Sequence, residues 1–159
     1  MKVSYNWLKE LVDLNGIDRD KFVHDLSLHV VEVDGVENLE KATNLVVGEV
    51  LEKVKHPDAD KLNVCQVNVG TDIRQIVCGA PNCQAGKKVI VALPGAKLPG
   101  GEIKEAKVRG VESRGMLCSL QELGVESKYV PAEYQHGIYF LSDDAKVGQN
   151  AIKALQYDD

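Results

Sequence analysis

Residues 44–54 read NLVVGEVLEKV, a run in which apolar and polar side chains alternate around a glycine at position 48. Alternation with a period of two predicts a β-strand. A glycine inside a strand often marks a sharp bend. A bent strand of this kind is typical of a small closed barrel and not of a flat sheet.

Four more short apolar stretches follow, separated by segments rich in glycine, proline and asparagine. We predict strands at residues 61–69, 73–78, 88–93 and 137–141. In the first of them the apolar side chains change face after Val64, which predicts a β-bulge near Cys65. Five short, curved strands favour the oligonucleotide-binding (OB) fold. The predicted class is therefore a β-rich α+β fold, in which a five-stranded OB-fold barrel is inserted into a small N-terminal α/β module.

The first part of that α/β module is predicted from residues 1–38. Residues 3–5 alternate as a short strand does, and Asn6 is expected to cap the helix that follows. Asn15-Gly16 is expected to end this helix, because glycine accepts the left-handed conformation that often closes a helix.

A second helix is predicted after Asp18, which is a good helix-capping residue. Residues 30–33 then predict another strand, and Asp34-Gly35 a turn. A unit this small is near the size below which a single core is hard to stabilise. We therefore expect it to need a partner surface.

The charge of the chain changes along its length. Its 159 residues carry 19 basic and 24 acidic side chains, for a net charge of −5. Residues 44–119 carry 11 basic and 8 acidic side chains, while the segments on either side each carry a net −4. A basic middle between acidic ends places any polyanionic partner on the middle. On charge alone, an ordinary solvated surface is the simpler interpretation of this net +3. We divide the chain into residues 1–38, the barrel at residues 39–148, and a short helical return to the module at residues 149–159.

Several chemistries are excluded by missing motifs. The chain has no Gly-x-Ser-x-Gly, no phosphate loop ending in Gly-Lys-Ser/Thr and no Cys-x-x-Cys pair. We expect the four cysteines to be buried thiols, and we predict no catalytic residue and no metal site. Acidic residues occupy the N-terminus and no apolar run approaches the ~20 residues that span a bilayer, so the expected compartment is the cytoplasm.

Three stretches of the basic middle carry a more specific signal. They are residues 55–62 (KHPDADKL), 77–82 (VCGAPN) and 107–119 (KVRGVESRGMLCS). In this order and spacing they resemble the tRNA-binding domain, an OB-fold module found in synthetases and in free-standing tRNA-binding proteins. The flanking residues 1–11 (MKVSYNWLKEL) and 32–37 (EVDGVE) look like the start of the β subunit of bacterial phenylalanyl-tRNA synthetases.

This resemblance implies a role in binding tRNA(Phe) for ATP-dependent aminoacylation in protein synthesis. Members of that family work as α2β2 heterotetramers, with the aminoacylation site on the α subunit and the editing site further along β. The whole β subunit is several times longer, so the chain is expected to be an N-terminal fragment without either site. ATP and magnesium are then implied for the parent enzyme only. One departure is Val30-Val31, where the family tends to show glycine followed by an aliphatic residue.

Candidate nucleic-acid contacts come from the basic side chains of these stretches and from two polar residues. Cations at phosphate spacing provide affinity, while amide and hydroxyl groups can bond to a base or a 2′-hydroxyl. The predicted contact residues are Lys55, Lys61, Asn82, Lys107, Arg109, Ser113 and Arg114. Asn82 and Ser113 have an equally good local interpretation, as a turn residue and a cap.

The middle of the chain lacks one feature of strong single-strand binders. Residues 44–128 contain no Phe, Trp or Tyr, so there is no aromatic platform for stacking bases. We therefore expect modest, electrostatic binding to the backbone and shape of tRNA. Two alternatives stay open: an assembly or scaffolding insert of the synthetase with weak RNA affinity, and a free-standing tRNA-binding protein.

Overall fold

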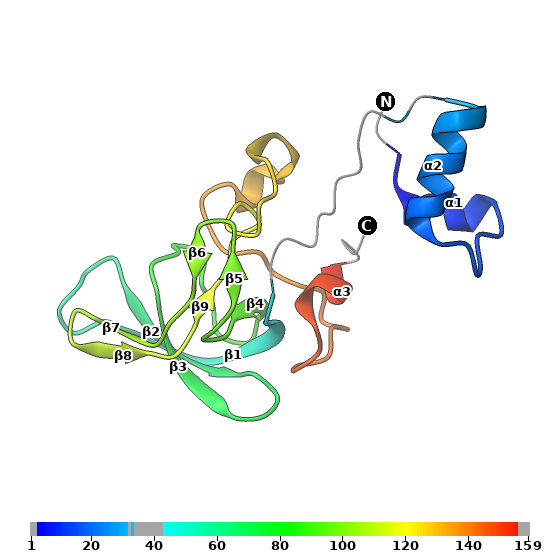
Figure 1. The fold of residues 1–159 in the computed structure, drawn as a ribbon. Helices are drawn as coiled ribbons and strands as arrows, with labels where there is room; N and C mark the ends of the chain where they lie inside the picture. Colours follow the sequence, from blue (N-terminus) through cyan, green and yellow to red (C-terminus); the bar gives the residue numbers. More distant parts are fainter. Residues whose placement is uncertain (1–2, 32, 34–42, 156–159) are drawn as a thin grey trace. The chain divides into compact units, whose positions relative to one another are not determined.

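The computed structural model describes residues 3–31, residue 33 and residues 43–155 (Figure 1). The chain divides into two compact units, residues 1–39 and residues 40–158. We call them the helical unit and the barrel unit and describe each by itself.

The helical unit contains α1 (Tyr5–Leu11) and α2 (Arg19–His29). Ser4 caps α1, because its hydroxyl accepts a hydrogen bond of 3.0 Å from the backbone N–H of Trp7. Asp18 caps α2 in the same way, as the sequence predicts. The prediction that Asn6 caps the first helix is wrong, because Ser4 already supplies the oxygen two residues earlier.

The other elements expected in the helical unit differ from the structure. α1 ends at Leu11, and Asn15-Gly16 forms a separate turn in which Gly16 has a φ of 76°. No strand occurs at residues 3–5, because α1 has already begun at position 5. The described residues of 30–33 are not in a strand either. The predicted turn at Asp34-Gly35 lies outside the described residues.

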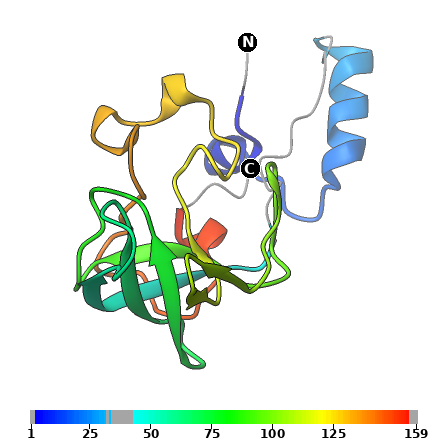
Figure 2. The same cartoon turned by 90° about the vertical axis from the view of Figure 1, so that its left-hand side faces the viewer.

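The barrel unit is built on one antiparallel sheet of five strands in the order β3-β2-β1-β4-β9 (Figures 1 and 2). Its strands are β1 (Leu45–Lys55), β2 (Asn63–Asn68), β3 (Ile73–Cys78), β4 (Lys88–Ala92) and β9 (Met116–Leu117). Two hairpins extend it, β5 (Lys97–Leu98) with β6 (Gly101–Glu102) and β7 (Ala106–Val108) with β8 (Val111–Ser113). Shorter helices follow at η1 (Ser127–Tyr129), η2 (Ala132–Tyr134) and α3 (Ala151–Leu155).

The sheet curls until its last strand approaches its first. The N–H of Arg114 donates to the carbonyl oxygen of Gln75 at 2.9 Å, which joins the segment between β8 and β9 to β3. The N–H of Val77 donates to the hydroxyl of Ser113 at 3.0 Å beside it. The result is a nearly closed, five-stranded barrel, which confirms the predicted β-rich OB-type class.

The fifth strand is not the one that the sequence suggests. Residues 137–141 make only an isolated bridge, between Phe140 and Val89, and β9 takes the fifth place in the sheet. The reason lies in the hydrogen bonds of Ile138. Its N–H and its carbonyl both pair with the side-chain amide of Asn82, so they are not available to a strand ladder.

The irregularity of the barrel wall is in β1 and not in β2. Val50 pairs with Val67 and Glu52 with Gln66, so Leu51 is the extra, bulged residue. The bulge predicted near Cys65 is therefore wrong, because β2 and β3 pair in register along their length. At Gly48 the structure shows a close approach of neighbouring side chains, because a Cβ there would lie 2.5 Å from Val91 Cγ2. The bend predicted at Gly48 remains a prediction.

Two apolar clusters hold the barrel unit together. One fills the barrel and includes Val50, Val67, Ile76 and Val91, while the other lies outside β1 and β4. Alternate residues of β1 and β4 contribute to both clusters, as the pleat of a strand requires. All four cysteines are free and buried, which confirms the predicted thiols.

The segment after the barrel returns to β1. The N–H of Gly148 donates to the carbonyl of Val47 at 2.8 Å, and α3 buries Ala151 and Ile152 in the outer cluster. The division of the chain at residues 38 and 148 remains a prediction. Within the described residues, no helix is long and apolar enough to cross a membrane.

Candidate nucleic-acid interface

The first basic segment is the β1–β2 loop, which follows Lys55. It is a compact turn, because the N–H of His56 donates to the carbonyl of Leu62 at 3.0 Å. The N–H of Asp58 donates to Nδ1 of the His56 ring at 3.0 Å. Lys55 and Lys61 flank this turn, and both are exposed. Lys55 also pairs with Asp60 at 3.2 Å, an exposed contact that water and salt screen.

The second basic segment is the β7–β8 hairpin. Arg109 and Gly110 form its two-residue turn, with φ angles of 48° and 82°. Positive φ at both central residues is the type I′ turn, whose twist matches the flanking strands. Glycine adopts this conformation freely, but for arginine it costs roughly 1–2 kcal/mol. The hairpin thus keeps a strained arginine at its tip, with Lys107 exposed on the strand beside it.

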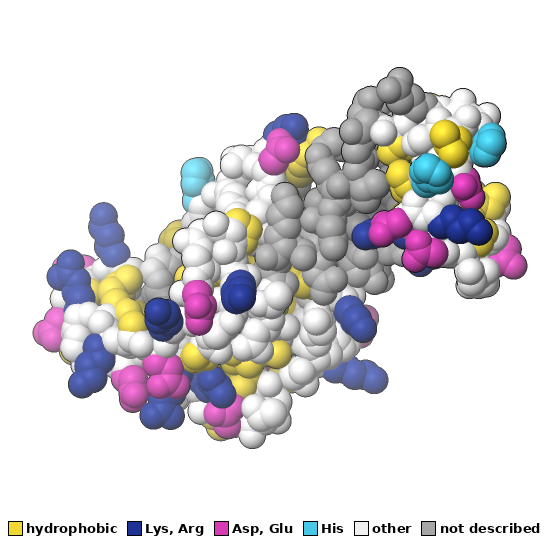
Figure 3. Space-filling model, in the orientation of Figure 1, with side chains coloured by type: hydrophobic (Ala, Val, Ile, Leu, Met, Phe, Trp, Pro, Cys, Tyr) yellow, Lys and Arg dark blue, Asp and Glu magenta, His cyan; other side chains and the backbone are white. Residues whose placement is uncertain are grey.

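The two basic segments meet through His56. Its Nε2 lies 3.0 Å from the carbonyl oxygen of Val108, the residue that precedes the hairpin turn. The ring is buried, with 3% of its surface exposed. We call the cations of the two joined segments the basic rim: Lys55, Lys61, Lys107 and Arg109. Figure 3 shows Lys and Arg side chains gathered at the end of the barrel where β7 and β8 lie in Figure 1.

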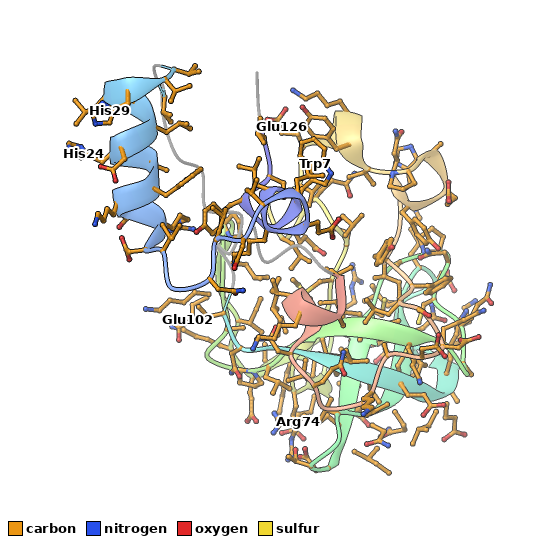
Figure 4. All side chains as sticks on the ribbon, turned by 90° about the vertical axis from the view of Figure 1, so that its right-hand side faces the viewer. Trp7, His24, His29, Arg74, Glu102 and Glu126 are labelled. Carbon is orange, nitrogen blue, oxygen red and sulfur yellow. The ribbon has the colours of Figure 1, made fainter. Side chains whose placement is uncertain are left out.

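The remaining predicted contact residues are Arg114, at the base of the hairpin, and Ser113 and Asn82, whose polar groups bond to the protein. Arg114 lies near Asp72. The pKa of the Asp72 carboxyl group is lowered chiefly by a hydrogen bond from the Thr71 hydroxyl, and the charge of Arg114 adds to this effect. It also pairs with Glu112 at 3.5 Å. Arg74, labelled in Figure 4, lies in this same region and bonds to Asp72 at 3.2 Å.

The hydroxyl of Ser113 and the amide of Asn82 both bond to the protein itself. Ser113 is buried, and its hydroxyl accepts from the N–H of Val77 and donates to the carbonyl of Gly115 at 3.1 Å. The amide of Asn82 donates to the carbonyl of Ile138 at 2.8 Å and accepts from its N–H at 3.0 Å. These bonds favour a structural role for Ser113 and Asn82 within the barrel unit. That either side chain contacts RNA remains a prediction.

Other lysines of the barrel are tied to backbone carbonyls. Lys53 donates to the carbonyl of Cys83 at 2.8 Å, and Lys88 donates to those of Asp143 and Ala145. An ammonium group held in this way fastens a loop and is less able to follow a phosphate. The exposed cations of the basic rim are the better candidates for an anionic ligand.

Two features of the site were missed or undervalued by sequence reasoning. The role of His56 as the link between the loops depends on Val108, 52 residues away, so no local pattern shows it. On β2 and β3, the paired residues Gln66 and Gln75 bond side chain to side chain at 3.3 Å. Their positions in two predicted strands were the available signal. Among the described residues, no three His, Cys, Asp or Glu side chains group as metal ligands.

The class of protein follows from the closed sheet and the loops at its end. A nearly closed five-stranded barrel with cationic loops at one end has the arrangement of an OB-type nucleic-acid-binding barrel. Residues 45–150 match the family described as a putative tRNA binding domain. The chain therefore belongs to the tRNA-binding domain family.

The whole chain is similar to the N-terminal region of longer bacterial proteins. It is 54% identical over 162 residues to the phenylalanine–tRNA ligase beta subunit of Halalkalibacterium halodurans, with 99% of this chain and 20% of that protein covered. It is 51% identical over 162 residues to the same subunit of Bacillus subtilis, with 100% of this chain and 20% of that protein covered. The chain thus spans about one fifth of the length of these curated relatives.

A solved structure is also similar to part of this chain. The MetRS related protein from Pyrococcus horikoshii is 26% identical to this chain, with 65% of this chain and 84% of that one covered, at a TM-score of 0.48.

Proposed function

We propose that this chain binds tRNA as part of a phenylalanine–tRNA ligase β subunit, and that the basic rim contacts the backbone of tRNA(Phe). The observation that carries the proposal is the contact of His56 with Val108, which brings two basic segments together at one end of the barrel. The family match and the similarity to phenylalanine–tRNA ligase beta subunits support it.

The expected binding is electrostatic. Cations that neutralise phosphates release condensed counterions, so affinity falls as salt rises. The basic rim has four cations and lies in a segment without aromatic side chains, so base stacking contributes little there. The strained backbone of Arg109 is consistent with a functional side chain, because strain of this kind is enriched at functional sites.

The remaining activities belong to the longer protein. We infer a parent enzyme that joins phenylalanine to tRNA with ATP and magnesium, pairs with an α subunit in an α2β2 assembly and works in the cytoplasm. This chain would supply a tRNA contact, while catalysis and editing would take place elsewhere in the assembly.

The test is tRNA binding as a function of salt. The unmodified chain should bind tRNA with an affinity that falls linearly with salt on a log–log plot. Lys61→Ala with Arg109→Ala should lower the slope by roughly 1–2, the value for one or two lost phosphate contacts. Filter binding or fluorescence anisotropy across a salt series measures both quantities.

A matched control removes the same charge far from the basic rim. Lys146 and Lys153 belong to the segment that packs on the start of β1. That segment contacts Val47, which is eight residues before Lys55, or roughly 26 Å away along the strand. The control is Lys146→Ala with Lys153→Ala. The control should keep the original slope. Equal slopes for the two double variants would remove the basic rim from the interface.

The assembly alternative rests on the missing aromatic platform. Deleting residues 44–148 from the full-length enzyme separates the two roles. Loss of aminoacylation at low tRNA with assembly intact supports tRNA binding. Loss of subunit assembly supports the scaffolding role instead.

A further inference from the structure

The buried ring of His56 uses both of its nitrogens. Nδ1 accepts from the N–H of Asp58, and a backbone N–H can only donate. Nε2 faces the carbonyl oxygen of Val108, which can only accept. These two partners require a neutral ring with its proton on Nε2. The same side chain therefore closes its own turn and reaches across to the hairpin.

The β7–β8 hairpin is held at both ends. Its base is bonded to β3, where Gln75 Nε2 donates to the carbonyl of Glu112 at 2.8 Å and Gln75 O accepts from the N–H of Arg114. Its tip is held by His56 through Val108. A two-residue turn between these two anchors leaves the backbone of Arg109 little conformational freedom. Both turn residues have positive φ, as a type I′ turn requires.

We propose that His56 is a positioning residue for RNA binding, which holds the hairpin cations at a set distance from those of the β1–β2 loop. Fixed spacing lowers the entropy that the protein loses when several cations engage several phosphates together. The two loops then bind one stretch of RNA backbone as a single surface. This inference rests on the proposed function.

Two substitutions separate the two bonds of the ring. In His56→Asn, the side-chain oxygen lies near the place of Nδ1 and can accept from the N–H of Asp58, as in an Asx-turn. Its amide is too short to reach Val108. In His56→Gln, the terminal amide lies near the place of Nε2 and can donate to Val108. His56→Asn thus keeps the turn and breaks the link, while His56→Gln keeps the link.

The experiment measures tRNA affinity of the full chain at several salt concentrations. His56→Asn should weaken binding at least fivefold and lower the salt slope, and His56→Gln should recover most of the loss. In a Lys107→Ala, Arg109→Ala background, His56→Asn should cost less than twofold, because the hairpin it positions no longer contributes. His24→Asn, on exposed α2 (Figure 4), is the matched control and should bind like the unmodified chain.

The outcomes separate this inference from the proposed function. If the unmodified chain shows no salt-dependent tRNA binding, or if the Lys107→Ala, Arg109→Ala pair has no effect, the proposed function fails. If that pair matters but His56→Asn does not, or costs the same in both backgrounds, the role of His56 is overturned. A folded His56→Gln chain that loses more than fivefold overturns it as well.

A measurement on the unmodified chain decides the case in which His56→Asn does not fold. Nitrogen-15 NMR of the histidine rings should show the Nε2–H tautomer for His56 in both the free and the tRNA-bound chain. The Nδ1–H tautomer, or loss of the bond to Val108 on binding, would overturn the proposal.

Discussion

In the helical unit, α2 has no buried residue, whereas in the barrel unit four of the five residues of β4 are buried. Trp7 and Leu11 of α1 are 53% and 63% exposed, while Val50 and Ile90 of the barrel are fully covered. Ser4 and Asp18 cap the two helices, and the rings of Tyr5 and Phe22 pack edge to face between them. The comparison teaches that local signals suffice to start a helix, and that only long-range packing makes a stable unit.

The largest expected difference between the units appears when the chain is cut. A chain of residues 43–159 should unfold in one cooperative transition, because both apolar clusters lie within it. A peptide of residues 1–39 should show no cooperative transition, because it has too little buried surface. Circular dichroism during heating measures both, and a sharp melt of the peptide would contradict the comparison.

A single methyl group at a glycine should affect the two units very differently. Gly48→Ala puts a Cβ within 2.5 Å of Val91 and 2.9 Å of Val67, so it should lower the free energy of unfolding of the barrel by about 3 kcal/mol. Gly16→Ala meets no atom within 4 Å and adds only backbone strain in the helical unit. Urea unfolding of the barrel should be shifted by the first variant and unchanged by the second.

Removing one asparagine side chain from each unit sharpens the comparison further. Asn82→Ala leaves the N–H and carbonyl of Ile138 without their partner, and should cost about 2 kcal/mol of barrel stability. The exposed Asn15 of the helical unit is the control, since Asn15→Ala should leave the barrel transition in place. Similar unfolding midpoints for the two variants would show that the Asn82 pairing is not needed.

The smallest effect is the part of the loss of barrel stability in alkali that comes from one thiol, that of Cys118. Burial raises the pKa of the Cys118 thiol from 9.0 to about 12. Above pH 9 the unfolded chain ionises this thiol and the folded chain does not, so stability falls as pH rises from 9 towards 12. At pH 10 this group should cost about 1 kcal/mol of barrel stability relative to pH 8. Denaturant unfolding of the unmodified chain and of Cys118→Ala at the two pH values measures this part as the difference between the two declines, and equal declines would contradict it.

Where a signal is local, the prediction from sequence is close to the structure. The alternation in residues 44–54 predicts β1, and the glycine within it occupies a position where a Cβ would meet Val91 and Val67. Asp18 caps α2 as expected. Predictions were wrong where a distant partner decides: Asn82 takes the backbone of Ile138 out of the sheet, and β9 becomes the fifth strand.

The candidate site shows the same division. Residue type and short-range spacing are enough to predict which segments are basic, which strands form most of the barrel wall, and that no aromatic platform accompanies the cations. Long-range contacts bring the segment of Lys107 and Arg109 to the segment of Lys55 and Lys61. They also place Arg114 near Asp72 and bury the hydroxyl of Ser113. These outcomes depend on hydrogen bonds between residues far apart in the chain, whose partners are set by how the barrel closes.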